Sequence, residues 1–147
     1  MNLRVFIQNE AGSNQKHHHD EKTFEWKSVM DISRHYPFPY GFVVGTTADD
    51  GGNVDCFVIT EEPLKTGQLI ECQIAGLMEQ FEDGQEDHNV LTTLPGTSVE
   101  IGPKVKEGLT EFVYAVFEQI EGTSIKVGQF LGVEDAEAYV AARSDPR

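Results

Sequence analysis

The chain has 147 residues, and 25 aspartates and glutamates outnumber 11 lysines and arginines, which gives a formal net charge of −14. This charge argues against nucleic acid and anionic membranes as partners, and no run reaches the roughly 18 consecutive apolar residues of a membrane helix. The length predicts a single domain over 1–147 with an adequate core. The N-terminus lacks the features of a signal peptide, so we expect a cytoplasmic protein.

The first two-thirds of the chain predicts short strands separated by turns. Apolar patterning places the expected strands at 3–8, 23–32, 41–47, 56–60, 69–79 and 89–94. Phe24 and Trp26 share one face of the second of these strands, and both are expected in the core. The segment YPFPY at 36–40 is expected to be irregular, because each proline fixes φ and removes a backbone donor.

The pattern changes at Pro103. From there to Ile120, apolar residues recur every three or four positions, which predicts an amphipathic helix over about 103–121. Pro103 suits the first turn of this helix, and Gly122 follows its end. A strand at 125–131 and a short helix at 134–142 complete the chain. Five or more strands with one substantial helix predict a mainly β fold with α, a small closed β-barrel packed by the long helix.

Carboxylates are concentrated in two predicted loops, DDGGNVD at 49–55 and FEDGQED at 81–87. Both loops end strands, so their side chains can converge at the rim of a barrel. Oxygen-only ligands suit hard cations such as Mg²⁺, Ca²⁺ or Mn²⁺. The simpler interpretation is a solvated acidic surface. EF-hand spacing, a P-loop and a dinucleotide fingerprint are all absent from the sequence.

Histidine and cysteine offer two further candidates. On a strand, His17 and His19 share one face and His18 points to the other. Two packing histidines and one at the rim is the simpler interpretation, and a transition-metal site is the alternative. Cys56 and Cys72 lie in apolar segments, which favours buried free thiols over a disulfide.

The order of several segments carries a family resemblance. GSNQK, YPFPYGFVVGT, ADDGGNVDCFVIT, FEDGQED and IKVGQFLGVEDAEA occur in sequence. Together they resemble soluble inorganic pyrophosphatases of the Mg²⁺-dependent, OB-fold type, over nearly the whole chain. The resemblance implies an OB-fold-like barrel with its site on the rim, and metal-dependent hydrolysis of pyrophosphate to two phosphates. It also implies a divalent cation (Mg²⁺, or another such as Mn²⁺ or Ca²⁺), pyrophosphate or another small phosphorylated ligand, and a homo-oligomer.

The resemblance assigns metal-binding positions residue by residue. Asp50, Asp55 and Asp87 match the aspartates that hold the family's tightest activating metal. Glu82 matches an acidic position that holds a metal carried by the substrate. Gly52 stands where the family has the aspartate that activates the attacking water.

The phosphate-binding positions match less well. Lys16, Tyr36 and Tyr40 are retained, and we expect Lys16 and Tyr40 to bind substrate. Cationic positions of the family fall at Ser28, Asn89 and Glu121, its helix tyrosine at Ile120, and two acidic positions at Gln8 and His18. Because electrostatic stabilisation is usually the largest catalytic term, these departures predict strongly reduced or lost hydrolysis with a retained metal site.

Two alternatives stay open. The first is an active Mg²⁺-dependent pyrophosphatase whose lost groups are replaced by relocated residues, such as Asp49, His18 and Arg34, with Lys27 as another cation within reach. The second is a non-catalytic structural, oligomeric or ligand-binding protein.

Overall fold

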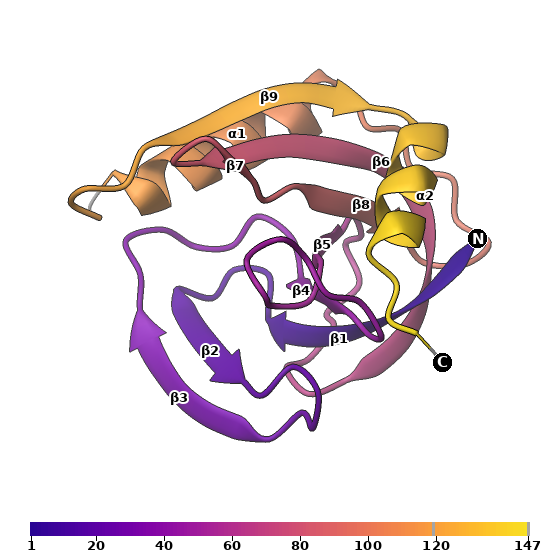
Figure 1. Ribbon diagram of the computed structural model, residues 1–147, viewed down its shortest axis with the longest axis horizontal. Coiled ribbons are helices and arrows are strands. Elements are labelled where there is room, and N and C mark those ends of the chain that lie inside the picture. Colours follow the sequence, from indigo (N-terminus) through magenta and orange to yellow (C-terminus); the bar gives the residue numbers. More distant parts are fainter. Residues whose placement is uncertain (119, 147) are drawn as a thin grey trace.

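The structure is a computed structural model that describes residues 1–118 and 120–146 (Figure 1). Five strands form a barrel, in the order β1 (Asn2–Asn9), β4 (Tyr40–Val43), β5 (Asp55–Val58), β8 (Asn89–Thr93) and β6 (Leu69–Glu82). The barrel closes because β6 pairs with both β8 and β1. Strands β5 and β8 run parallel, and the other barrel pairs are antiparallel. This arrangement confirms the predicted closed barrel.

Further elements surround the barrel. Strand β6 continues beyond it to pair with β7 (Gln85–Glu86) and β9 (Ile125–Leu131). Strands β2 (Gln15–His19) and β3 (Trp26–Asp31) form a separate hairpin, which lies on the side of the barrel away from β9 in Figure 1. The helices are α1 (Pro103–Phe117) and α2 (Val133–Ala142), and α2 packs beside β6.

Two apolar clusters stabilise this arrangement. One fills the barrel and the space under α2, with Val5, Cys56 and Val90 fully buried. The other lies between the barrel and α1, where Leu109, Phe112 and Val113 pack against residues such as Phe57. Because α1 buries the face that its apolar spacing predicts, the helix is held over the barrel and alongside strand β9.

Three predicted boundaries are wrong. Helix α1 ends at Phe117, short of 121, because Ile120 N–H donates to the Phe117 carbonyl and Gly122, at φ +78°, turns the chain towards β9. Residue 119 of that predicted helix lies outside the described residues. The strand expected at 23–32 covers only 26–31, since Phe24 has φ +68°. The strand expected at 41–47 ends at Val43, before the turn at Gly45.

The two aromatic residues expected in the core also differ. Phe24 stacks on Phe6 with ring centroids 5.0 Å apart, and its ring is tilted against that of Phe42 at 6.1 Å. Trp26 is 54% exposed, and its indole N–H donates to His17 Nδ1 over 3.1 Å. The core prediction is therefore wrong for Trp26, because every residue of β3 faces solvent.

The segment FEDGQED is not an open loop. Strand β6 runs through Glu82, β7 begins at Gln85, and only Asp83 and Gly84 connect them, at φ 51° and 82°. Two successive residues at positive φ are typical of a tight hairpin connection. Glu82 therefore lies on a strand, and Asp87 follows the hairpin directly.

Cys56 and Cys72 are buried free thiols, as predicted. In the part of the chain that the structure describes, neither helix is both long and apolar enough to cross a membrane.

Candidate active site at the barrel rim

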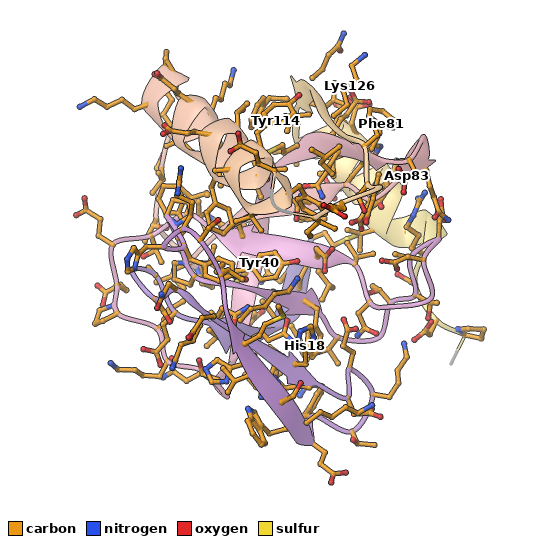
Figure 2. The ribbon with its side chains drawn as sticks, turned by 90° about the vertical axis from the view of Figure 1, so that its left-hand side faces the viewer. His18, Tyr40, Phe81, Asp83, Tyr114 and Lys126 are labelled. Atoms are coloured by element: carbon orange, nitrogen blue, oxygen red, sulfur yellow. The ribbon has the colours of Figure 1, made fainter. Side chains whose placement is uncertain are left out.

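A cavity of about 400 Å³ opens where the barrel, the β2–β3 hairpin and helix α1 meet. In Figure 2, Tyr40 lies between α1 and the hairpin that carries His18, and both residues line this cavity. Helix α1 supplies apolar lining, including Phe112 and Val116. Five carboxylate side chains also line it: Glu21, Asp50, Asp55, Glu82 and Asp87.

The turn between β4 and β5 presents Asp50 to the cavity. Ala48 N–H donates to the Gly52 carbonyl over 2.7 Å, and Gly51 N–H donates to the Ala48 carbonyl over 3.0 Å. Gly51 has φ +89°, a conformation that glycine adopts without strain. Asp50 Oδ1 accepts the Gly52 N–H over 3.0 Å, which fixes one of its oxygens.

Asp55 opens strand β5 in a half-buried position. Burial raises the pKa of Asp55 well above its usual range, and repulsion from Asp87 and then Glu21 adds to this effect. A hydrogen bond with the Tyr40 hydroxyl acts in the opposite direction. Asp55 is therefore a carboxylate whose charge needs compensation.

Asp87 lies beside Asp55 on the neighbouring segment. Burial, followed by repulsion from Asp50, raises the pKa of Asp87 to about 6, while Lys16 lowers it. Among the cavity-lining residues that the structure describes, Lys16 is the single lysine or arginine. Five carboxylates facing one lysine create a strongly negative site, which favours binding of a cation.

The residues suit a hard divalent cation in their chemistry. All five acidic side chains offer oxygen ligands, as Mg²⁺ prefers. Within residues 1–118 and 120–146, however, no three His, Cys, Asp or Glu side chains lie close enough together to hold one ion. After burial, repulsion from a neighbouring carboxylate is the next cause that raises the pKa values of Asp55 and Asp87. The structure brings these residues to one cavity, and their sharing of one ion stays a prediction.

The positions that the family resemblance assigns to phosphate binding also reach the cavity. Lys16, Tyr36 and Tyr40 line it, and the two tyrosine rings stack with centroids 5.5 Å apart. Asn89, at a cationic position of the family, is buried and donates its side-chain N–H to Gln80 Oε1 over 2.7 Å. Its amide is therefore part of the strand packing.

The histidine triplet divides as the strand pattern predicts. His18 lines the cavity, whereas His17 accepts the Trp26 indole N–H and His19 packs edge-on against Phe6 at 4.9 Å. Burial lowers the pKa of His18, and the neighbouring Lys16 lowers it further. A neutral imidazole at the rim is the expected form near neutral pH.

Most of the relocated groups in the active-enzyme alternative lie elsewhere. Asp49 Oδ2 is 3.4 Å from Arg143 Nη2 and lies outside the cavity lining. Arg34 lines a separate cavity on the other side of the α1 end, and Lys27 Nζ is 3.9 Å from Asp20. His18 alone of the proposed replacements faces the carboxylates.

Glu21 is a site residue that the sequence did not suggest. It lies in the turn between β2 and β3, immediately after the histidine triplet and Asp20. Because it belongs to none of the motifs that carry the family resemblance, only the folding of the hairpin against the β4–β5 turn reveals its position.

A closed barrel with a carboxylate-lined cavity at its mouth defines a class of proteins that bind ligands at the barrel rim. The sequence model of one family, inorganic pyrophosphatase, matches residues 5–144. The chain therefore belongs to the inorganic pyrophosphatase family.

Individual relatives agree with this assignment. The inorganic pyrophosphatase of Nanoarchaeum equitans is 28% identical over 151 residues, which cover 95% of this chain and 94% of that protein. The inorganic pyrophosphatase of a Nostoc species is 29% identical over 150 residues, covering 95% of this chain and 86% of that protein.

Solved structures support the fold. The inorganic pyrophosphatase of Thermus thermophilus superposes with a TM-score of 0.86 at 23% identity, covering 97% of this chain and 88% of that one. The inorganic pyrophosphatase of Coxiella burnetii gives 0.84 at 23% identity, covering 97% and 92%. At these identities the comparison establishes the barrel fold, and the chemistry must be argued from the residues of this chain.

Proposed function

We propose that this protein binds divalent cations, Mg²⁺ in the first place, and slowly hydrolyses pyrophosphate to two phosphates. The proposal depends on one observation: Asp50, Asp55, Glu82 and Asp87 come from separate segments and line the same cavity as Lys16. In this proposal Asp50, Asp55 and Asp87 hold the activating cation, and Glu82 holds a cation that arrives with the substrate.

Each remaining group has a role that follows from its charge. When bound, divalent cations neutralise the phosphate oxygens and polarise the phosphorus centre towards attack. Lys16 binds a phosphate oxygen through its ammonium group, and Tyr40 offers a hydroxyl beside Asp55. Helix α1 contributes the apolar residues Val113 and Val116, which exclude water from one side of the cavity.

The expected rate is low because positive charge is scarce. Family positions for cationic ligands hold Ser28, Asn89 and Glu121, and Arg34 and Lys27 lie outside the cavity lining. Loss of one preorganised electrostatic contact typically costs ~3 kcal/mol, or about a hundredfold in rate. Because losses within one site are not additive, we predict reduced turnover without summing them.

Location and assembly complete the proposal. We propose a cytoplasmic homo-oligomer with no nucleic-acid or membrane partner. Exposed apolar side chains on β3 support an assembly surface, since Trp26, Val29 and Met30 are 54%, 42% and 54% exposed. Light scattering coupled to size-exclusion chromatography measures the number of chains, and a monomer at micromolar concentration contradicts the assembly.

One experiment tests the catalytic proposal. Phosphate release from pyrophosphate is measured with Mg²⁺ and with Mn²⁺, and metal binding is measured by calorimetry. Asp55→Ala is expected to abolish both, while Glu25→Gln, an exposed carboxylate outside the cavity lining, leaves both unchanged. Metal binding without phosphate release would instead indicate a ligand-binding protein, and absence of both would indicate a structural one.

A further inference from the structure

Two adjacent glycines in the β4–β5 turn, Gly51 and Gly52, differ in whether their backbone conformation requires glycine. Gly51 has φ +89° and needs glycine for its backbone. Gly52 is not among the glycines at positive φ, so backbone conformation does not dictate its missing side chain. A Cβ added at Gly52 meets Glu21 Oε2 at 3.1 Å, Asp50 Oδ1 at 3.5 Å and Glu21 Oε1 at 3.7 Å. The carboxylate of Glu21 therefore occupies the space beside Gly52.

Asn53 forms hydrogen bonds with both the side chain and the backbone of Glu21. Asn53 N–H donates to Glu21 Oε1 over 3.2 Å. The Asn53 side-chain amide donates to the Glu21 carbonyl over 3.2 Å and to the Val43 carbonyl over 3.1 Å, and Asn53 is only 2% exposed. Because Asn53 belongs to the same turn as Gly52, Glu21 keeps its position relative to that turn.

The hairpin turn itself is also fixed. Asp20 Oδ1 accepts the N–H groups of Lys22 and Thr23, both over 2.9 Å. Lys22 Nζ reaches across to the Thr46 carbonyl over 2.9 Å, which ties the hairpin to the β4–β5 segment. Lys22 is thus directed to Thr46 and away from pairing closely with Glu21.

The environment of Glu21 is that of the metal-binding candidates. It lines the same cavity as Asp50 and Asp55, and its charge is among those that repel Asp55. Among the described residues, Oε2 of Glu21 accepts no hydrogen bond, while Oε1 accepts the Asn53 N–H. One carboxylate oxygen is anchored, and the other is available at the site.

We propose that Glu21 supplies the carboxylate that activates the attacking water, in place of the side chain that Gly52 lacks. This role rests on the proposed hydrolysis of pyrophosphate. Glu21 accepts a proton from water as the water oxygen bonds to phosphorus. The bridging P–O bond breaks, and its electron pair remains on the departing phosphate. The proton then leaves Glu21 for solvent, and two phosphates have formed.

The first test separates this role from a structural one. Glu21→Gln keeps the acceptor for Asn53 N–H but removes the basic charge, and Glu25→Gln serves as the matched control in the same hairpin. Positioned general bases contribute typically 10²–10⁴-fold. We expect kcat to fall at least about a hundredfold in Glu21→Gln, with KM changed by less than about threefold. An unchanged kcat overturns the role of Glu21 and leaves the proposed function intact.

Metal binding provides a readout that does not depend on turnover. Calorimetric affinity for Mn²⁺ alone is expected to fall less than about tenfold in Glu21→Gln, since one neighbouring charge is lost. Complete loss of Mn²⁺ binding in this variant makes Glu21 a principal metal ligand and overturns the water-activating role. If the wild-type protein releases no phosphate under any metal, the proposed function and this inference both fail.

A residue exchange gives the sharpest test. Gly52→Asp alone places a second carboxylate against Glu21 and is expected to lower kcat. In the double variant Glu21→Ala with Gly52→Asp, the new side chain has the vacated space, and kcat is expected to recover at least about tenfold over Glu21→Ala, within the range of a positioned general base. No recovery, in a variant with wild-type circular dichroism and Mn²⁺ affinity, overturns the proposed exchange of roles.

Discussion

The most informative perturbation of the acidic site is removal of one charge in the absence of metal. Asp87 is partly buried, and burial with repulsion from Asp50 raises its pKa to about 6. The folded protein therefore binds more protons than the unfolded chain between about pH 4 and pH 6, so the free energy of unfolding falls as pH rises through this window. Above it, the charged Asp87 destabilises the metal-free protein.

The magnitude follows from the change in pKa. A rise of about two pKa units corresponds to at most about 3 kcal/mol, and partial exposure of Asp87 reduces this to roughly 1–2 kcal/mol. Asp87→Asn carries no charge at any pH. We expect the variant to be more stable than the wild type by that amount at pH 7.5 in chelator, and equally stable below about pH 3.5, where Asp87 is protonated in both the folded and the unfolded chain. For a chain of this size the difference is about 2–6 °C in Tm.

Thermal unfolding with and without Mg²⁺ measures the effect. Burial lowers the pKa values of His18 and His19, so the free energy of unfolding also falls at low pH as these side chains become protonated. The variant is therefore compared with the wild type at each pH. With Mg²⁺ the order should reverse, because the cation stabilises only the chain that binds it. A variant no more stable than wild type at pH 7.5 in chelator would refute the reasoning.

Three further predictions concern single side chains. Lys16→Met should lower kcat/KM for pyrophosphate by about a hundredfold or more in a phosphate-release assay, because Lys16 is the one lysine among the described residues that line the cavity; a change under threefold would contradict its role. Leu109→Ala should cost about 2–5 kcal/mol in urea unfolding, because Leu109 is fully buried on the face of α1 that packs against the barrel, and a loss below 1 kcal/mol would contradict that packing. Asp49→Asn should leave the Mn²⁺ affinity within about twofold by calorimetry, since Asp49 faces Arg143 outside the cavity lining. A large loss of Mn²⁺ affinity would show instead that Asp49 is a metal ligand.

The barrel was predictable because its signals are local. Alternating or continuous apolar runs placed β1, β5, β8 and β9 close to their observed positions, and the three-to-four spacing placed the start of α1. Ends of elements were less predictable, since they depend on turns. The end of α1 at Phe117 and the short strand at Trp26 both reflect nearby residues at positive φ, Gly122 and Phe24, which the apolar pattern does not reveal.

The candidate site was predictable only where the family motifs pass through it. Asp50, Asp55, Asp87, Lys16 and Tyr40 follow from matching segments in order, and each lines the cavity. Trp26 shows the opposite case. Its apolar character suggested the core, but all six residues of β3 are exposed, and Trp26 is exposed with them.

Glu21 shows why a substituted motif is weak evidence for lost chemistry. Gly52 removes a carboxylate from one point of the chain, but the space it leaves is bordered by a carboxylate from the preceding hairpin, 3.1 Å from the absent Cβ. That proximity requires Asn53 to bond both the backbone and the side chain of Glu21, across thirty-two positions in each case. A sequence comparison aligned position by position has no means of finding it. The cationic positions expected from the family resemblance are a different case, because the described residues that line the cavity include no lysine or arginine beyond Lys16. In the mechanism we propose, the carboxylates bind a cation and Glu21 activates water, while the low positive charge limits the rate by weakening binding of the anionic substrate and its transition state.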